Sequence, residues 1–435
     1  MLKRGDKKLI NAWAFYDWAN SVYSLVISTA VFPIYYSSLT ESFSGIEGKI
    51  NFLGTQWDPT TLYDYTLAFS FLIIAFISPI LSGIADYTGN KLKFLKVFCL
   101  IGSLSVMSLF FFKGEETLWV GIVFTILASI GFWGSIVFYN SYLPEVAYPE
   151  QQDDVSAKGF IFGYAGSIIL LIMCLVLIQF PSLFGLETGL ATRISFILVG
   201  LWWLGFAQIT YRRLPNNVYN RKPEKDYFWK GLRELKIVYN ELNKHPELKM
   251  FLRSFFTFSV GVQTIILMAG IFGSKELGLP TLDLIAVILL VQIVGIAGAF
   301  LFSRLSDRIG NLPTLKITIL IWAMVCFVAF MLDKTQENIQ YYFYGLGALI
   351  GLVMGAIQSL SRSTYSKLLP ETRDHATYFS FYDVTEKVAI VFGMLVFGLL
   401  ISLTGSMQWS VLFLAIFFLI SFVLLNFVGK TKYVQ

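Results

Sequence analysis

Charged residues are scarce in this sequence, and cysteine and histidine are scarcer still. Only 14% of the 435 residues are charged, whereas 56% are hydrophobic and 17% are aromatic. Soluble globular domains are only about 45–50% apolar, so this composition disfavours a soluble fold. The 3 cysteines fall inside apolar runs and the 2 histidines fall outside them. The sequence therefore predicts no disulfide, no metal site and no cofactor.

The sequence contains many long apolar runs that carry few charged residues. A helix needs about 20 apolar residues to cross a hydrocarbon core of about 30 Å. Twelve windows meet this requirement, and short polar loops separate them. They lie near residues 12–38, 63–85, 92–112, 117–140, 158–181, 190–211, 250–273, 281–303, 314–332, 340–366, 378–403 and 408–428. We therefore expect an all-α, polytopic membrane protein with twelve transmembrane helices.

Basic residues are distributed unevenly among the loops. With the N-terminus inside, 27 of the 33 Lys and Arg residues fall on inside segments and 5 on outside loops, while Lys387 lies within a window. Because basic residues are retained on the cytoplasmic side, both termini are predicted to be cytoplasmic, at the inner (plasma) membrane if the source is bacterial. The net charge of +5 then reflects topology, and we expect no nucleic-acid partner.

A polar stretch between the sixth and seventh windows divides the chain into two halves. It predicts a six-helix bundle over residues 1–213, a basic cytoplasmic linker over 214–249 and a second six-helix bundle over 250–435. Internal repeats support this plan, because they are common in transporters. The repeated segments are Ser82–Lys91 and Ser303–Asn311, after the second and eighth windows, and Leu143–Glu145 and Leu369–Glu371, after the fourth and tenth.

The first repeated segment resembles the cytoplasmic loop signature of the major facilitator superfamily, Gly-x-Leu-Ala-Asp-Arg-x-Gly-Arg-Lys. The matching residues are Asp86, Gly89 and Lys91 in one copy and Asp307, Arg308 and Gly310 in the other. Tyr87 departs from the signature, which has a base there. An Asp at a helix end can sit against the N-terminus of a neighbouring helix, and Gly permits a tight turn. We expect the two loops to form a conformational latch; the alternative is a pair of ordinary solvated loops.

Two further motifs resemble a narrower branch of that superfamily. They are Trp13–Ser21 in the first window and Gln358–Ser363 in the tenth. Both are similar to signatures of the vacuole-effluxer-like branch, whose fungal, autophagy-related member exports amino acids from the vacuole. The resemblance implies two pseudo-symmetric six-helix bundles, with spans 1, 4, 7 and 10 lining a central cavity.

The first window carries a polar stripe. It consists of Asp17, Asn20, Ser21, Ser24 and Ser28, which fall within roughly 60° of one line at 100° per residue. An ionisable group in a bilayer is costly unless it is paired or hydrated. The stripe is therefore interpreted as a cavity wall, with Asp17 binding a solute amine, a cation or a proton. Alternatively, Asp17 only caps or pairs near the cytoplasmic boundary.

The tenth window combines glycines with an amide and a guanidinium on one face, in the order Gly347, Gly351, Gly355, Gln358 and Arg362. Glycine allows a helix or a ligand to approach closely. Arg362 could bind a solute carboxylate through two hydrogen bonds. The alternative is that the glycines pack helices and Arg362 anchors the cytoplasmic end.

The eleventh window places Asp383, Glu386 and Lys387 on one helix face, where Asp383 can pair with Lys387 one turn later. Glu386 is a candidate for proton coupling. The alternative is an ion-pair cluster that only holds helices together.

Taken together, these patterns predict a secondary active transporter, acting as a monomer, that moves a small polar solute such as an amino acid. The hypothesis includes coupling to protons or another ion. It also includes rocking of the two halves, in which the Asp86 and Asp307 loops stabilise an outward-facing state. The sequence has no Gly-x-x-x-x-Gly-Lys-Ser/Thr loop for ATP and no histidine within a window, so an enzyme is not expected. A membrane sensor or scaffold on a transporter fold is the alternative.

Overall fold

The computed structural model describes residues 3–45, 48–216, 227–242 and 244–429. Within these ranges, twelve helices are long and apolar enough to cross a membrane, and each predicted window overlaps one of them. The helices generally run past the windows, as with Pro59–Thr88 around the window at 63–85. Hydropathy marks only the part of a helix that crosses the hydrocarbon core, so it omits the polar turns at each end. The all-α, polytopic fold is confirmed.

The first half contains six spans. Its first span is continuous over Lys7–Phe43 and is made of α1 (Lys7–Val22), a π-helical segment (Tyr23–Val31) and α2 (Phe32–Phe43). The others are α3 (Pro59–Thr88), α4 (Lys91–Ser108), α5 (Leu118–Asn140) with the short α6 (Leu143–Val146), α7 (Gln152–Gln179) and α8 (Thr188–Tyr211). A hairpin of β1 (Ile50–Phe52) and β2 (Thr55–Trp57) joins the first two spans, with Ile50 opposite Trp57.

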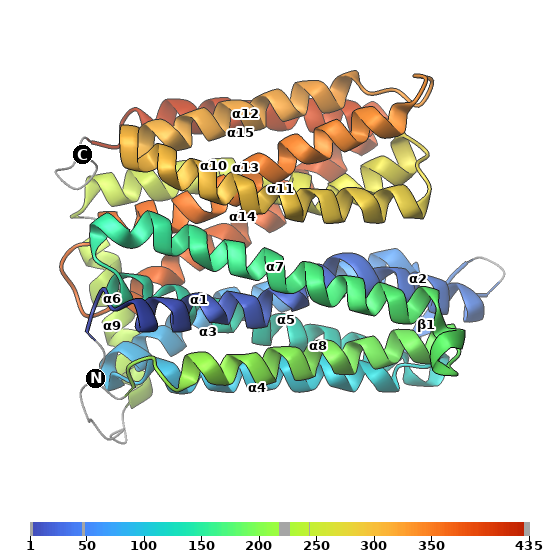
Figure 1. Ribbon diagram of the computed structural model, residues 1–435, viewed down its shortest axis with the longest axis horizontal. Helices are drawn as coiled ribbons and strands as arrows, with labels where there is room; N and C mark the ends of the chain where they lie inside the picture. Colours follow the sequence, from blue (N-terminus) through green and yellow to red (C-terminus); the bar gives the residue numbers. More distant parts are fainter. Residues whose placement is uncertain (1–2, 46–47, 217–226, 243, 430–435) are drawn as a thin grey trace.

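The second half contains the other six spans. They are α10 (Pro246–Ile271), α11 (Thr281–Ile309), α12 (Asn311–Met331), α13 (Ile339–Leu368), α14 (His375–Thr404) and α15 (Met407–Leu425). Each half has its own cluster of buried hydrophobic side chains. Figure 1 shows the halves as two layers of long, nearly parallel helices.

The linker between the halves contains a helix that the sequence analysis did not predict, α9 (Tyr227–Leu242). It packs mainly against α3 of the first half. Its Val238 and Leu242, one turn apart, are buried in the core of the second half. The apolar spacing of these two residues is a helical signal, but the high charge of the linker obscured it. Linker residues 217–226 lie outside the described residues.

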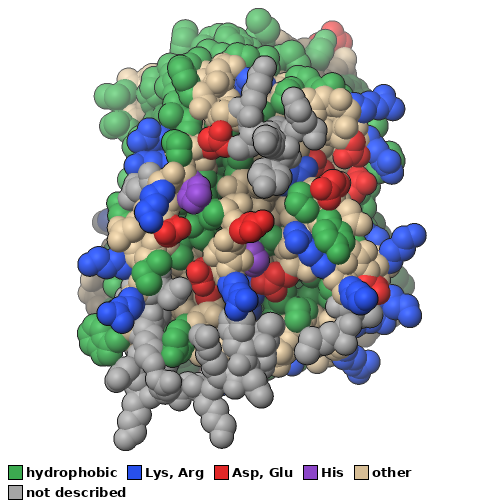
Figure 2. Space-filling model, turned by 90° about the vertical axis from the view of Figure 1, so that its left-hand side faces the viewer, with side chains coloured by type: hydrophobic (Ala, Val, Ile, Leu, Met, Phe, Trp, Pro, Cys, Tyr) green, Lys and Arg blue, Asp and Glu red, His purple; other side chains and the backbone are tan. Residues whose placement is uncertain are grey.

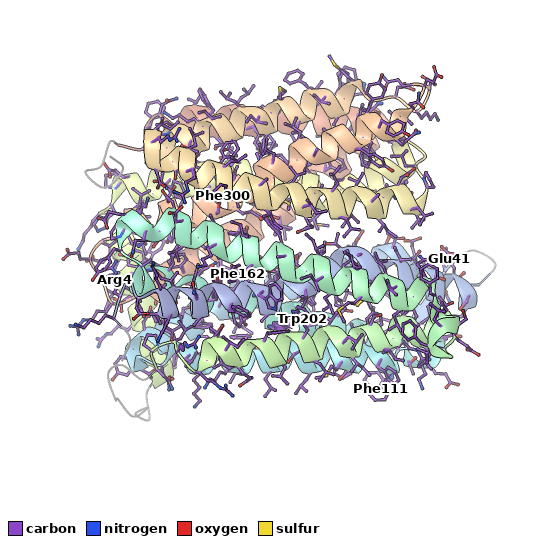
Figure 3. All side chains as sticks on the ribbon, viewed as in Figure 1. Arg4, Glu41, Phe111, Phe162, Trp202 and Phe300 are labelled. Atoms are coloured by element: carbon purple, nitrogen blue, oxygen red, sulfur yellow. The ribbon has the colours of Figure 1, made fainter. Side chains whose placement is uncertain are left out.

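The start of α1 and the end of α15 lie at the same end of the molecule, which we call the termini side (Figure 1). Arg4 lies at this end, and Glu41 lies at the opposite end, the far side (Figure 3). Lys and Arg side chains surround the face seen from the termini side (Figure 2). Across the boundary between halves, α7 packs against α11 and α13, and α3 packs against α14.

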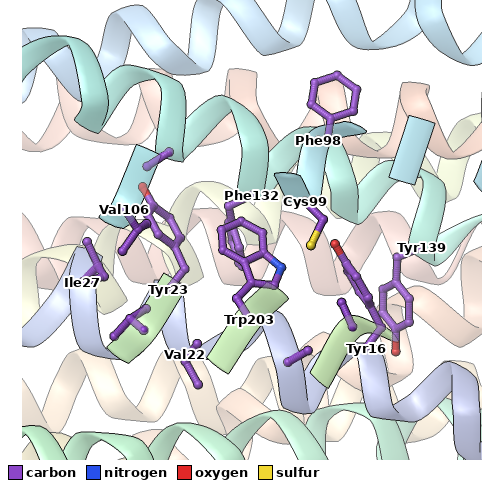
Figure 4. Packing of buried hydrophobic residues seen from close by; sticks show 14 of the residues in the cluster. Tyr16, Val22, Tyr23, Ile27, Phe98, Cys99, Val106, Phe132, Tyr139 and Trp203 are labelled. Carbon is purple, nitrogen blue, oxygen red and sulfur yellow. The ribbon is translucent and has the colours of Figure 1, made fainter. Parts of the chain in front are cut away.

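Large aromatic side chains fill the core of the first half. Tyr23, Phe132 and Trp203 lie together between α4, α5 and α8 and the first span (Figure 4). Gly102 of α4 and Gly131 of α5 allow this packing, because an added Cβ at either position would collide with Trp203 or with the facing backbone. Interiors are packed as densely as organic crystals, so this core gives α1 a rigid support.

Candidate functional site

A buried ion pair joins the two halves between α1 and α13, and we call Asp17 and Arg362 the central pair. Arg362 Nη1 lies 3.4 Å from Asp17 Oδ2, and the two residues are only 3% and 6% exposed. Arg362 Nη1 also donates to Asn140 Oδ1 at 3.1 Å, while Tyr139 donates its hydroxyl to Asp17 Oδ2 at 2.7 Å. A buried charge is tolerated only when it is paired and hydrogen-bonded, as both are here.

The remaining contacts of Arg362 also reach into the first half. Its Nε donates to Ser156 Oγ at 2.9 Å and its Nη2 to the Ser156 carbonyl at 2.8 Å. The guanidinium carbon lies 4.9 Å from the ring centre of Trp13 and 4.3 Å from that of Phe160. In this conformation the donors of Arg362 hold the halves together, so a solute carboxylate would have to displace these partners.

A second buried cluster lies on α14, and we call Asp383, Glu386 and Lys387 the lysine cluster. Lys387 Nζ lies 2.8 Å from Asp383 Oδ1 and 3.2 Å from Glu386 Oε2. Its ammonium also sits 3.6 Å from the ring centre of Trp133 on α5, which is a cation–π contact between the halves. The cluster carries a net charge of −1 when all three groups are ionised.

The two carboxylates of the lysine cluster differ in their surroundings. Glu386 Oε1 accepts a hydrogen bond of 2.8 Å from Gln263 of α10, and its side chain is 17% exposed. Asp383 is 3% exposed, and among the described residues its Oδ2 has no hydrogen-bond partner. A buried carboxylate oxygen without a hydrogen-bond partner is costly.

The two clusters occupy different depths. Arg362 lies 6 residues before Leu368, the termini-side end of α13, which is roughly 9 Å at 1.5 Å per residue. Lys387 lies 12 residues after His375, the termini-side end of α14, or roughly 18 Å. Because α14 has 30 residues and is roughly 45 Å long, the lysine cluster lies near its middle. The central pair is therefore closer to the termini side than the lysine cluster.

At the termini side, Asp86 of α3 caps the N-terminus of α14 across the boundary between halves. Its carboxylate accepts hydrogen bonds from the backbone N–H of Ala376 at 3.2 Å and of Thr377 at 2.7 Å, and from the Thr377 hydroxyl at 2.8 Å. Gly89, at a φ of +68°, makes the turn that ends α3. A carboxylate at a helix N-terminus is favoured by the free N–H groups and by the helix dipole.

Lys91, also in the signature loop, forms a short ion pair with Glu145. The same carboxylate lies 3.0 Å from Nδ1 of His375 in the other half. The loop after α3 and the Leu143–Glu145 segment therefore meet at Glu145, which contacts the start of α14. Sequence pattern does not indicate that these two segments lie close together, because their proximity depends on the fold.

The second copy of the signature loop is arranged differently. Asp307 and Arg308 are exposed, and no described residue forms a hydrogen bond with Asp307. The contact between halves runs instead through Asp153 of α7, which accepts from Ser306 at 2.8 Å and from Asn311 at 2.7 Å. Lys367 pairs with the same carboxylate at 2.7 Å. Gly310, at a φ of +88°, is the N-cap residue of α12.

The residues of the predicted polar stripe on the first span differ in burial. Asn20 is fully buried, and among the described residues its Nδ2 has no partner, whereas Ser24 is exposed. The π-helical segment begins at Tyr23 and has more residues per turn than an α-helix. Positions beyond Val22 therefore rotate away from the line that an α-helical spacing predicts.

The glycine face of α13 packs against another helix. An added Cβ at Gly351 or Gly355 would collide with the backbone of α11 at Val291 or Gly295. This arrangement corresponds to the helix-packing alternative. Gln358, further along the same helix, accepts a 2.8 Å hydrogen bond from the Tyr164 hydroxyl of the first half.

Several residues that complete these clusters were not predicted from the sequence: Trp133, Tyr139, Asn140, Asp153, Ser156 and Tyr164. They lie on α5 and α7, where single polar groups occur among apolar residues without a periodic pattern. Only Asn140 and Asp153, polar residues near the ends of their spans, offered a local signal. Among the described residues, no group of three His, Cys, Asp or Glu side chains could hold a metal ion.

Known structures resemble this fold closely. A proton:xylose symporter of the major facilitator superfamily, XylE, covers 98% of this chain and 97% of its own with a TM-score of 0.71 at 15% identity. The superfamily transporter FucP, in its outward conformation, covers 98% of both chains with a TM-score of 0.70 at 12% identity. The fold is therefore that of a major facilitator superfamily transporter, a multi-pass integral membrane protein.

Sequence comparison narrows the class. Residues 5–433 match the family described as "Vacuole effluxer Atg22 like", so the chain belongs to that family, as its motifs predicted. An uncharacterised MFS-type transporter of Bacillus subtilis, YxiO, is 33% identical over 99% of this chain and 96% of its own. Autophagy-related protein 22 of Coccidioides immitis is 23% identical over 95% of this chain and 85% of its own.

Proposed function

We propose that this transporter moves an amino acid by alternating access and couples the movement to protons. The observation that carries the proposal is the lysine cluster, where Lys387, Asp383 and Glu386 present both signs of charge near the middle of α14. A zwitterion needs an anionic group for its amine and a cationic group for its carboxylate. The Asp383 Oδ2 atom, buried without a partner among the described residues, is the position proposed for the amine or for the coupling proton.

The contacts between halves support a state that is closed on the termini side. Hydrogen bonds accepted by Asp86, Glu145 and Asp153 and donated by Arg362 join the halves within the termini-side part of the bundle. The basic face around the termini supports the assignment of this side to the cytoplasm (Figure 2). In the proposed cycle, this closed state faces outward, and release inward requires these contacts to open.

The central pair is assigned a coupling role in this cycle. Arg362 uses its donors on Asp17, Asn140 and Ser156 while the termini side is closed. Opening that side separates Arg362 from the first half and leaves buried charges without partners, which is costly. A solute carboxylate that reaches Arg362 would offset this cost, so solute binding would favour opening.

Transport by purified protein in proteoliposomes tests the proposal. A panel of labelled amino acids is offered with and without a pH gradient, and we expect saturable flux that accumulates solute only when the gradient is present. Glu386→Gln removes a titratable carboxylate but keeps the hydrogen bond to Gln263 possible. We expect this variant to lose gradient-driven accumulation while it still exchanges labelled for unlabelled solute.

The matched control is Glu116→Gln, which changes an exposed carboxylate on the far side and should leave both activities unchanged. Accumulation by Glu386→Gln at the wild-type level would refute a role for Glu386 in proton coupling. Absence of flux for every amino acid, in protein that melts at the wild-type temperature, would refute the solute class.

A further inference from the structure

A groove opens on the surface of the second half where α9, α10 and α14 meet. It has a volume of about 570 Å³. Val384 and Val388 line the groove from α14, and at 100° per residue they lie roughly 100° around the helix from Asp383 and Lys387. The groove is therefore lined by a different face of α14 from the one that carries Asp383 and Lys387.

The polarity of the groove changes with depth. Lys249 and Arg253 lie in the first two turns of α10, roughly 5 and 10 Å from its first residue, Pro246. Phe256 lies deeper on the same helix, and Val388 lies roughly 20 Å from the start of α14. The groove thus has a basic mouth toward the termini side and an apolar floor toward the membrane centre, which is the orientation of a lipid in that leaflet.

The two bases are the strongest donors in the lining. They are four residues apart and therefore share one face of α10, and Arg253 is exposed. The hydroxyls of Thr257 and Thr385 donate to carbonyls of their own helices, each at 2.7 Å. No acidic side chain lines the described part of the groove. Arg and Lys together suit a phosphate, which Arg can bind through two hydrogen bonds.

We propose that the groove binds an anionic phospholipid of the termini-side leaflet. Its phosphate contacts Lys249 and Arg253, and one acyl chain lies along Phe256, Val384 and Val388. Basic pockets between transmembrane helices bind anionic headgroups, with about 1 kcal/mol from each base near the surface. A zwitterionic lipid would bring its amine to the two bases and bind less well.

The proposed lipid also contacts the helix that joins the two halves. Leu242 of α9 lines the groove, and α9 packs on α3 of the first half. A bound lipid would therefore fix α9 against the second half. Through this contact, the lipid composition of the leaflet would affect the relative position of the two halves.

Competitive lipid binding tests the proposal. Purified protein is incubated with equal amounts of phosphatidylglycerol and phosphatidylcholine, and native mass spectrometry counts the lipids retained. We expect the wild-type chain to retain phosphatidylglycerol preferentially. The double variant Lys249→Gln/Arg253→Gln should lower that preference by about thirtyfold, since each base contributes a factor of about five.

Two controls separate this site from general attraction to a basic surface. Lys93→Gln/Lys96→Gln removes two exposed bases at a similar depth on α4 and should leave the preference unchanged. Val388→Trp fills the floor of the groove without changing charge, at a side chain that is 49% exposed, and should also abolish retention. Val97→Trp, at a side chain that is 45% exposed on α4, should not.

Equal retention of phosphatidylglycerol by the wild-type chain and the Lys249/Arg253 double variant would overturn the proposal. So would an equal loss in the Lys93/Lys96 control. Inorganic phosphate that displaces the lipid from the wild-type chain, and that binds Val388→Trp equally well, would show a site for soluble anions instead.

Discussion

Replacement of Asp86 by Asn tests the contact that holds the start of α14 closed. The side chain keeps its size but loses its charge, while Asp86 in the wild-type chain accepts hydrogen bonds from the N–H groups of Ala376 and Thr377. Hydrogen bonds to a charged group contribute about 1.5–3 kcal/mol, and neutral ones about 0.5–1.5. The helix dipole adds about 0.3–1 kcal/mol.

The expected cost follows from these magnitudes. An Asn at position 86 can accept one of the two backbone hydrogen bonds through its single carbonyl oxygen, and only as a neutral acceptor. We expect the closed termini side to lose about 2 kcal/mol, which is about thirtyfold in the equilibrium between closed and open. The Glu145–His375 and Asp153–Lys367 contacts remain, so the protein still folds and still closes.

Hydrogen exchange at α14 measures this equilibrium directly. The exchange rate of a protected amide follows the population of the open form, so the amides of Ala376 and Thr377 should exchange about thirtyfold faster in Asp86→Asn. Asp307→Asn is the matched control, because Asp307 holds the corresponding place in the repeat but is exposed. Exchange within threefold of the wild-type rate in Asp86→Asn, or equal acceleration in Asp307→Asn, would refute the reasoning.

Two further predictions concern the central pair. Gly159→Ala should lower the melting temperature through a loss of about 1–3 kcal/mol, because the added Cβ would lie 2.5 Å from Asp17 Oδ2; Gly205→Ala, whose Cβ meets nothing within 4 Å, should not. Arg362→Gln should destabilise the chain by about 3–5 kcal/mol because Asp17 is left buried and unpaired. Addition of Asp17→Asn should recover part of this loss in a double-mutant cycle of melting curves, and simple additivity would show that the pair is not coupled.

Local sequence pattern was sufficient to predict one contact of the candidate site. Helical spacing alone predicts that Asp383 and Lys387 meet, and they lie 2.8 Å apart. The contact depends on a single helix turn, so no knowledge of the fold is needed. The positions of the spans and the repeat after α3 and α11 are likewise properties of short segments.

The partners of Arg362 are contacts that local sequence pattern does not predict. Arg362 and Asp17 are 345 residues apart in the chain. Each was interpreted either as a solute contact or as a group near the cytoplasmic boundary, and neither was predicted to contact the other. The Trp133 ring under Lys387 carried no polar signal at all. Contacts of this kind depend on how the two halves dock, which hydropathy and periodicity do not encode.

The sequence by itself determined the twelve spans and the family, because apolar run length and short motifs can be recognised without knowledge of the tertiary structure. Only the tertiary structure decided which of two repeated carboxylates is used. Asp86 reaches the N-terminus of α14, but Asp307 remains exposed while Asp153 makes the contact on its side. Equivalent residues in the two halves have different neighbours, because each half docks against a surface that its own sequence does not contain.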